Sequence, residues 1–428
     1  MKNDQSSELK FVDLFAGCGG LSLGLENAGF HPVLVNELNK DAMASYLVNR
    51  SDSYPLLETR YSVQDVKKLV LEDEFRNDLI SEMLDDYGLN VKMGKLDLLV
   101  GGPPCQGFSG IGHRRSYSVD KKQLPSNRLY EDMAFLINEF QPRLFLFENV
   151  KGLLSARWTP EGDKGEIWED VRSKFEELPG YRTRWSLVHA KDYGTPQNRP
   201  RVLLVGVRDD LNIELGHDID AVKAGLLPPP TGKPPHIEDL LGDLVDPSYT
   251  NGDITEEYPS RPLNEVQSML RMSREGLPSK AGDPLKEQEY SKHKPEILKK
   301  FVHMVKTQGE IPASMETKKF AQCYLPPVWG EQGPTITATS LPDDYVHFSQ
   351  PRIPTVREWA RLQMFPDWYR FEGKRTTGGV RRAGNPREGI FDRELPKYTQ
   401  IGNAVPVSLA TEVGGHFANL LRKSNNSK

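Results

Sequence analysis

The bulk properties of the chain limit what it can be. It has 428 residues, of which 37% are hydrophobic and 9% aromatic, so we expect two or three domains and at least one large core. Its three cysteines are too few and too scattered for a disulfide framework or a zinc site, which favours a reducing, cytoplasmic setting without a bound metal. No apolar signal region or membrane-spanning run is visible, so we expect no membrane association.

Charge is unevenly distributed along the chain. The formal net charge is −5, but residues 351–428 contain 14 Lys and Arg against 7 Asp and Glu. That segment therefore carries +7, and the rest of the chain carries −12. A basic face on an acidic protein can still bind phosphates, although a solvated basic tail would have the same composition.

The first predicted elements are a strand over 10–15, a glycine-rich turn over 16–20 and a helix over 21–29. This order is typical of a nucleotide-binding βαβ unit. The dinucleotide fingerprint is incomplete, because Ser22 stands where its third glycine would be. The sequence therefore favours a nucleotide-like cofactor but not a nicotinamide dehydrogenase.

The second predicted strand, over 32–36, ends at Glu37, which lies 20 residues after Gly17. An acidic side chain at that place can accept hydrogen bonds from ribose hydroxyls, whereas the alternative is an ordinary solvated strand end. A helix is predicted from Asp41 to about Arg50. The mostly helical region that follows is acidic and gives no further functional signal by itself.

A nucleophile candidate follows the third clear strand. The apolar run at 98–100 predicts a buried strand, the glycine pair 101–102 lets the backbone turn sharply, and the proline pair 103–104 stiffens the exit. Cys105 comes next, at the end of a strand where α/β sheets bind ligands. A lone cysteine is more often a small buried core residue, but the Pro-Pro-Cys-Gln context favours the nucleophile.

Three further segments have the composition of a site. A glycine-containing basic loop over 107–122 is suited to closing over an anionic ligand. The apolar strand predicted at 144–147 ends at Glu148, a carboxylate that is costly to bury ionised and can therefore serve as a proton donor. Arg199 and Arg201, two residues apart before a strand, project to the same side and suit an anion or a base carbonyl.

From about Asp209 the composition of the chain changes. The segment 227–235 is a proline-rich linker, and the region up to about Phe320 is polar and irregular, which predicts a separate, smaller domain. A helix is predicted at 356–363, and a C-terminal helix begins within 398–410, with Pro406 near its first turn.

These stretches resemble the DNA (cytosine-5)-methyltransferase family, in the family's own order and over nearly the whole chain. Each motif alone is weak, but the ordered set is highly specific. The unmatched block 209–328 falls where the family keeps its variable target-recognition region. In chain order, the matching motifs are 13–20, 36–37, 102–106, 148–150, 197–201, 357–367 and 400–406.

The resemblance implies an α/β fold. We expect a doubly wound, mostly parallel Rossmann-like sheet, as in S-adenosylmethionine-dependent methyltransferases, with a second, smaller and irregular target-recognition domain. Residues 1–208 would form the catalytic and cofactor-binding domain and 209–395 the target-recognition domain. Residues 396–428 would return to the catalytic domain.

The resemblance also implies a reaction, the transfer of a methyl group from S-adenosylmethionine to carbon 5 of a flipped-out cytosine in a specific duplex DNA sequence. The Cys105 thiolate would add to carbon 6, and Glu148 would protonate or hydrogen-bond ring nitrogen 3. Arg201 would hold the carbonyl at carbon 2, while Arg199 would orient Glu148 or the nucleophile.

For the cofactor, Phe15 would stack near the adenine, Glu37 would bind the ribose and Asp65 the adenine amino group. The complete set expected to bind S-adenosylmethionine is Asp13, Phe15, Gly17, Gly19, Gly20, Glu37, Leu38, Asp65, Val66, Pro103, Asn403 and Val405.

The expected partner is double-stranded DNA, with a cognate restriction endonuclease that acts on the same site without direct contact. We expect a monomeric bacterial restriction–modification enzyme that works at the nucleoid. One alternative is a tRNA cytosine-5 methyltransferase, but its Cys-Phe-Thr signature is absent and the nearest text is Cys323-Tyr-Leu. Another is a catalytically silent DNA-binding regulator, which would have lost Cys105, Glu148 or the glycine turn.

Overall fold

The computed structural model describes residues 8–104, 128–316, 322–330, 333–336, 344–376 and 394–426. Its internal contacts divide the chain into two compact units. The first comprises Met1–His189, Pro200–Thr231 and Leu409–Lys428, and the second comprises Ala190–Arg199 and Gly232–Ser408.

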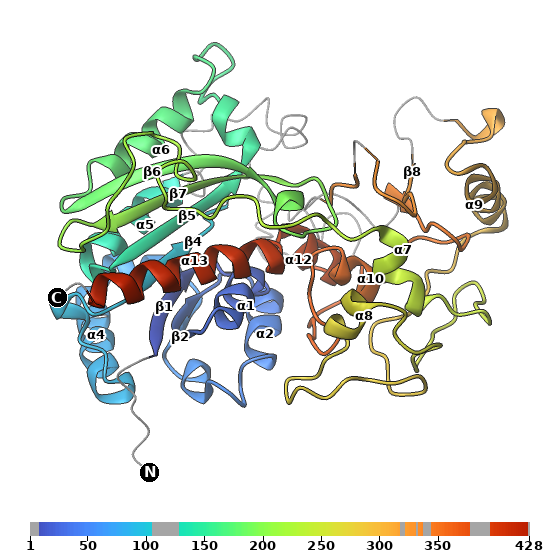
Figure 1. Ribbon diagram of the computed structural model, residues 1–428, viewed down its shortest axis with the longest axis horizontal. Helices are drawn as coiled ribbons and strands as arrows, with labels where there is room; N and C mark the ends of the chain where they lie inside the picture. Colours follow the sequence, from blue (N-terminus) through green and yellow to red (C-terminus); the bar gives the residue numbers. More distant parts are fainter. Residues whose placement is uncertain are drawn as a thin grey trace, which may run out of the picture. The chain divides into compact units, whose positions relative to one another are not determined.

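A seven-stranded sheet forms the centre of the first unit (Figure 1). Its strands are β1 (Leu9–Leu14), β2 (Phe30–Asn36), β3 (Ser62–Val63), β4 (Leu98–Gly101), β5 (Leu144–Val150), β6 (Tyr181–His189) and β7 (Pro200–Arg208). The order across the sheet is β3-β2-β1-β4-β5-β7-β6. The first five strands in this order run parallel to one another, and β7 runs antiparallel to both of its neighbours, β5 and β6. The predicted doubly wound, mostly parallel sheet is therefore confirmed.

The central strands are apolar because both faces of the sheet are covered. The side chains of Leu98, Leu99 and Val100 in β4 are fully buried. The helices of this unit are α1 (Gly20–Asn27), α2 (Lys40–Val48), α3 (Val66–Leu71), α4 (Asp73–Tyr87), α5 (Leu129–Phe140), α6 (Glu166–Glu176) and α13 (Val407–Asn426). Helix α13 runs alongside α1 in Figure 1, so close that a Cβ at Gly24 would clash with the backbone of Ala410.

The order of the strands creates a switch point in the sheet. From β1 the chain winds outward through β2 and β3, and then returns to β4 on the other side of β1. In open α/β sheets, ligands bind beyond the carboxyl ends of the strands at such a point. Leu14 and Gly101, the last residues of β1 and β4, are in register, so the segments that follow them leave the sheet side by side.

The second unit is irregular, as predicted. Its helices are α7 (Ile237–Leu241), α8 (Glu265–Leu270), α9 (Pro295–Thr307), α10 (Val356–Arg361) and α12 (Lys397–Asn403), and a two-stranded parallel sheet is formed by β8 (Cys323–Tyr324) and β9 (Tyr345–Val346). Helix α10 begins with a capping box, in which Thr355 and Glu358 satisfy each other's backbone N–H groups. Among the residues that the structure describes, no helix is both long and apolar enough to cross a membrane.

Buried ion pairs hold the second unit together where regular structure is sparse. Arg361 is fully buried and pairs at 2.6 Å with both Asp243 and Asp367, and Arg271 shares Asp243. Burial opposes ionisation of Glu358, but the charge and hydrogen bonds of Arg352 outweigh this and hold the pKa of Glu358 at about 2. Removing one partner from such a pair would leave an uncompensated buried charge, so these positions tolerate little change.

The C-terminal helix begins next to Pro406, as predicted, but a short helix that was not predicted precedes it. Helix α12 ends at Asn403, and α13 begins at Val407, directly after Pro406. Proline disfavours helical geometry at the preceding residue and lacks the N–H that a helix interior needs, which explains the break. Asn403 is the last residue of α12, and Val405 lies between the two helices. Side chains at such a break are not confined to one face of a continuous helix.

Candidate active site

The segments that follow β1, β2, β3 and β4 all leave the same edge of the sheet, because these strands are parallel. They contain most of the residues that the sequence singles out. Phe15 and Gly17 follow β1, Glu37 follows β2, and Asp65 follows β3. The predicted cofactor residues of the first unit are thus assembled at one edge from separate parts of the chain.

The turn after β1 needs its glycines. Gly17 and Gly19 have φ angles of 58° and 87°, in the left-handed region where a Cβ is unfavourable. Phe15 also has a positive φ, of 61°, and its N–H faces the side-chain oxygen of Asn36 at 3.4 Å. A Cβ added at Gly17 would meet no atom within 4 Å, so this part of the turn borders open space.

Glu37 links the glycine turn to the loop after β2. Its carboxylate accepts hydrogen bonds from the backbone N–H of Gly17 at 2.8 Å and from that of Asn39 at 2.7 Å. Burial raises the pKa of Glu37, and the two backbone hydrogen bonds counteract part of this effect. A carboxylate has about four lone-pair positions, so two remain for hydroxyl donors. The adjacent Leu38 is 71% exposed and offers an apolar surface beside them.

Asp65 and Val66 begin helix α3. The Asp65 side chain is exposed and caps the helix by accepting a hydrogen bond from the N–H of Lys67 at 2.9 Å, while Val66 is buried. Asn36, which was not among the predicted site residues, donates to the carbonyl oxygens of Val63 and Gln64. It joins the ends of β1, β2 and β3, and its place beside Glu37 at a strand end is the signal that could have revealed it.

Asp13 lies beneath the turn rather than on its surface. Its carboxylate is buried and accepts a 2.5 Å hydrogen bond from the Ser22 hydroxyl, which also contacts the hydroxyl of Tyr46 at 2.9 Å. Burial raises the pKa of Asp13 to about 7, although the Ser22 hydrogen bond and the charge of Arg50 oppose this effect. The residue therefore supports the turn from inside.

The raised pKa of Asp13 leads to a testable pH dependence. Between about pH 4 and pH 7 the folded protein binds more protons at Asp13 than the unfolded chain does, so stability falls as the pH rises. The full loss is on the order of 4 kcal/mol. We expect Asp13→Asn, which keeps an acceptor for Ser22, to melt at a higher temperature than the wild type at pH 8 and to lose this advantage at pH 5. A difference in melting temperature that does not change with pH would contradict the assignment.

The glycine pair after β4 has a different role from the one predicted. Neither Gly101 nor Gly102 has a positive φ, so they are not needed for a sharp turn. They are needed for close approach, since a Cβ at Gly101 would lie 2.8 Å from the sulfur of Met133 and one at Gly102 would lie 2.8 Å from Oε2 of Glu148. Gly102 thereby brings the β4 exit directly against the Glu148 carboxylate.

The backbone that leads to the predicted nucleophile is also fixed from β5. Pro103 is buried, and its carbonyl oxygen accepts a hydrogen bond from Nδ2 of Asn149 at 3.2 Å. The Asn149 side chain itself accepts from the N–H of Val150. Cys105, the following basic loop and the glycine-rich basic loop near Gly378 lie outside the described residues.

Glu148 and Arg201 form a largely buried ion pair next to Gly102. The Nε atom of Arg201 lies 2.6 Å from Oε1 of Glu148, and the two side chains are 8% and 12% exposed. The antiparallel pairing of β5 with β7 places Arg201 opposite Val150, which brings the start of β7 to the same edge. Burial lowers the pKa of Arg201 and the charge of Glu148 opposes this. The pair is a fixed carboxylate–guanidinium unit at the end of β5.

Arg199 has other partners, which include three backbone carbonyl groups of the second unit. Its guanidinium donates to the carbonyl oxygens of Gly402 at 2.6 Å and Ala404 at 3.1 Å, and also to that of Ile336. Arg199 therefore fixes the break between α12 and α13, where Asn403 is exposed. The contact with Glu148 is made by Arg201, although the sequence led us to expect Arg199 in the orienting role.

The comparisons with known proteins agree with this geometry. The family model for C-5 cytosine-specific DNA methylase matches residues 9–419. The chain belongs to this family. It is 32% identical to the Type II methyltransferase M.PspPI of Psychrobacter sp. over 98% of this chain and 82% of that protein, and 29% identical to M.DdeI of Desulfomicrobium norvegicum over 96% and 90%. A crystal structure described as a DNA modification methyltransferase encoded within an E. coli prophage has the same fold, with a TM-score of 0.65 at 24% identity, over 97% of this chain and all of that one.

As a C-5 cytosine-specific DNA methylase, the protein is an enzyme that methylates carbon 5 of cytosine in DNA and uses S-adenosylmethionine. The predictions of family, fold and reaction are confirmed. The described residues fit an adenosyl cofactor, because the open side of the Gly17 turn, the remaining acceptors of Glu37 and the exposed Leu38 lie at one edge.

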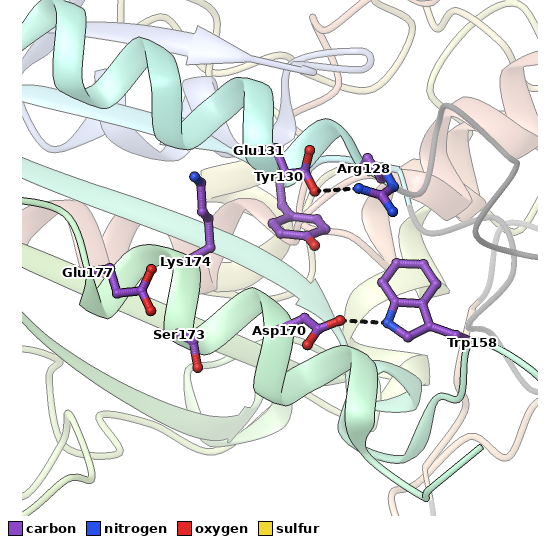
Figure 2. Close-up of a pocket in the computed structure, with 8 residues that line it drawn as sticks. All are labelled: Arg128, Tyr130, Glu131, Trp158, Asp170, Ser173, Lys174 and Glu177. Atoms are coloured by element: carbon purple, nitrogen blue, oxygen red, sulfur yellow. Dashed lines mark hydrogen bonds and ion pairs between the residues drawn. The ribbon is translucent and has the colours of Figure 1, made fainter.

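One pocket of this methylase is formed by α5, α6 and the segment between β5 and α6. It has a volume of about 340 Å³ and lies at the start of α5 and along α6 (Figure 2). The lining residues are Arg128, Tyr130, Glu131, Trp158, Asp170, Ser173, Lys174 and Glu177. Figure 2 shows two of its carboxylates engaged locally, Glu131 with Arg128 at 3.1 Å and Asp170 with the indole N–H of Trp158 at 2.6 Å. None of the predicted site residues lines this pocket.

Proposed function

We propose that the enzyme works through a covalent adduct between Cys105 and carbon 6 of a flipped-out cytosine. Carbon 5 of cytosine is a poor nucleophile until a thiolate adds at carbon 6 and makes the ring enamine-like. The observation that carries the proposal is the Glu148–Arg201 pair held against Gly102, three residues before Cys105 in the chain. It provides an acid and a cation for a pyrimidine ring, close in the chain to the predicted nucleophile.

In this mechanism Glu148 donates a proton or hydrogen bond to ring nitrogen 3, so that charge does not accumulate on the ring during addition. Arg201 has five N–H donors in a rigid fork, and its Nε lies against Glu148. We assign it two tasks, holding Glu148 in place and binding the carbonyl at carbon 2. We assign Arg199 a positioning role through the carbonyls of Gly402 and Ala404.

S-adenosylmethionine supplies the methyl group. We propose that the glycine turn after β1 cradles it, with Phe15 against the adenine and Glu37 on the ribose hydroxyls. Asp65 would bind the adenine amino group, since it is exposed at the end of β3. Completing the proposed set are Gly19, Gly20, Leu38, Val66, Pro103, Asn403 and Val405, with Asp13 acting through Ser22.

Bisulfite sequencing of DNA from cells that express the protein tests the function directly. We expect protected cytosines at one short sequence and none in cells that express Cys105→Ser. Protection scattered over all cytosines, or methylation found in tRNA instead, would contradict the proposal of sequence-specific DNA methylation.

We also propose that residues 209–328, together with the basic loop near Gly378, select the DNA sequence. Base contacts specify a site, whereas phosphate contacts position the protein, and the catalytic motifs leave this block unassigned. Residues 209–395 would then be the target-recognition domain. Part of the block has a structural task, however, because Trp185 of β6 exchanges backbone hydrogen bonds with Ile219 and Ala221.

An exchange that tests this proposal should therefore replace residues 232–328, and not the whole block 209–328, with the corresponding block of another family member. The exchange leaves the β6 contacts intact. It should keep Asp243 and Arg271, because Arg361 would otherwise lose one of its two buried partners and the Asp243–Arg271 pair would be broken. We expect this chimaera to methylate the donor's sequence. The control is a chimaera with the same block but Asp243→Ala, which should fail to fold. A folded chimaera that still methylates the original sequence would place the recognition residues elsewhere.

The biological setting follows from the same proposal. The named relatives are Type II methyltransferases, and we propose that this protein also protects DNA against a cognate restriction endonuclease that recognises the same site. No direct contact between the two enzymes is required. A monomer acting on the nucleoid in the bacterial cytoplasm would be sufficient, since one chain contains every motif of the site.

A further inference from the structure

Arg50 lies behind the glycine turn and has no exposed surface. It follows α2, and its guanidinium reaches across to α1 and to the turn. The Nε atom donates to the Glu26 carboxylate at 2.7 Å, and Nη2 lies 2.6 Å from the same oxygen. Nη2 also donates to the carbonyl oxygen of Gly19 at 3.2 Å, and Nη1 to that of Tyr46 at 3.0 Å. One side chain thus joins the turn to two helices.

The carbonyl group of Gly19 anchors the turn through two hydrogen bonds. Gly19 has a φ of 87°, and its oxygen accepts from the N–H of Leu23 at 2.9 Å as well as from Arg50. The hydrogen bond from Leu23 lies within α1, so by itself it would let the turn tilt together with that helix. The hydrogen bond from Arg50, which follows α2, connects the turn to α2 as well. The direction of the Gly17–Gly19 backbone therefore depends on Arg50.

Arg50 is itself held firmly. Its guanidinium carbon lies 3.9 Å from the centre of the Tyr46 ring, and the Tyr46 hydroxyl contacts Ser22, which donates to Asp13. Glu26 is 10% exposed, so its charge depends on Arg50 for compensation. A planar fork with several fixed donors can satisfy these acceptors together, which a lysine ammonium cannot do in the same geometry.

We infer that Arg50 is a positioning residue for S-adenosylmethionine, acting through the Gly19 carbonyl on the turn that cradles the cofactor. The inference rests on the proposed assignment of the glycine turn to the cofactor. Arg50 touches neither cofactor nor substrate in this role. Its loss should weaken cofactor binding more than it slows the reaction of the fully loaded enzyme.

If Arg50 only stabilised the fold, its loss would lower the melting temperature without weakening cofactor binding more than it slows the reaction. The chain contains a matched control for this possibility. Arg143 is another buried arginine of the first unit, which pairs with Asp97 at 2.8 Å and donates to the Leu421 carbonyl. Asp97 directly precedes β4, at the edge of the sheet opposite to the glycine turn. Arg143→Met should therefore destabilise the fold without reaching the cofactor.

The experiment measures the dissociation constant of S-adenosylmethionine by calorimetry on the full chain, with melting temperatures and the KM for each substrate. We expect Arg50→Met to raise the dissociation constant and the KM for S-adenosylmethionine about tenfold or more, because charged hydrogen bonds are lost. The KM for DNA should stay unchanged, and Arg50→Lys should recover part of the affinity. Arg143→Met should leave the dissociation constant within about twofold, since distant sites act independently.

Two further variants keep the inference falsifiable. If Arg50→Met does not fold, Glu26→Gln loosens the same anchor while keeping an acceptor oxygen, and it should raise the dissociation constant by a smaller factor. Glu37→Gln tests the proposed cofactor site itself. If Glu37→Gln weakens binding but Arg50→Lys and Glu26→Gln do not, the inference about Arg50 is wrong. If Glu37→Gln has no effect either, the assignment of the turn to the cofactor fails first.

Discussion

We expect Cys105→Ser to abolish methyl transfer, with a rate at least about a thousandfold below that of the wild type. A serine hydroxyl is far less ionised than a thiol at neutral pH and cannot add to carbon 6 at a useful rate. The affinity for S-adenosylmethionine should stay within about twofold of wild type, because all proposed cofactor residues except Pro103 lie outside the segment that follows β4. Turnover of tritiated S-adenosylmethionine on duplex DNA measures the first quantity, and calorimetry measures the second.

The two other cysteines provide controls for this experiment. Cys323 is exposed in β8 of the second unit, and Cys323→Ser should retain normal turnover. Cys18 is buried in the glycine turn, and burial raises the pKa of its thiol to about 12, so it does not compete as a nucleophile. Substantial turnover by Cys105→Ser would exclude the covalent route.

Trapping identifies the nucleophile independently. In duplex DNA with 5-fluorocytosine at the target position, fluorine cannot leave as a proton, so the adduct persists after methyl transfer. We expect a denaturation-resistant complex that requires S-adenosylmethionine, with DNA attached to the peptide that contains Cys105. DNA attached to the Cys323 peptide, or no complex on DNA that the enzyme otherwise methylates, would be incompatible with the mechanism.

The sequence predicted the fold well because its central strands are uniformly apolar and end in marked residues. The runs at β1, β4 and β5 were found within a few residues of their observed bounds, since strands buried on both faces need continuous apolar sequence. The antiparallel direction of β7 was not predicted, because strand direction depends on pairing between distant segments. Pro406 was predicted near the first turn of the C-terminal helix, and α13 indeed begins directly after it, but the short helix α12 before it was missed.

Side-chain contacts were harder to predict than strand ends. The sequence placed Glu37 and Glu148 at the correct edge, yet it could not show that Gly102 makes room for Glu148. Nor could it show that Arg201, two residues after Arg199, is the one that contacts Glu148. Arg50 looked like an ordinary helix end, since a buried arginine is recognisable only from the acceptors that other segments bring to it.

The Glu148–Arg201 pair gives the second large expected effect. Glu148→Gln keeps the shape of the side chain but cannot deliver a proton to ring nitrogen 3. We expect kcat to fall by about a hundredfold or more, because general acid catalysis contributes at least that much. The dissociation constant for S-adenosylmethionine should not change. Quench-flow or steady-state turnover at saturating DNA measures the loss.

A matched ion pair separates catalysis from stability in this experiment. Arg143 and Asp97 are 10% and 12% exposed, nearly the same as Arg201 and Glu148, but they lie at the opposite edge of the sheet. Asp97→Asn should therefore lower the melting temperature by an amount similar to that of Glu148→Gln and leave kcat within about threefold. If Glu148→Gln lost no more activity than Asp97→Asn, the carboxylate would only stabilise the fold.

Arg201→Met completes the test, because it removes the group that orients Glu148. Residues that act as one unit are not additive, so the double variant Glu148→Gln/Arg201→Met should be scarcely slower than the worse of the two single variants. Independent roles would instead multiply the two losses. A multiplicative result would mean that the 2.6 Å contact between Arg201 and Glu148 has no part in catalysis, and that Arg201 acts on the base alone.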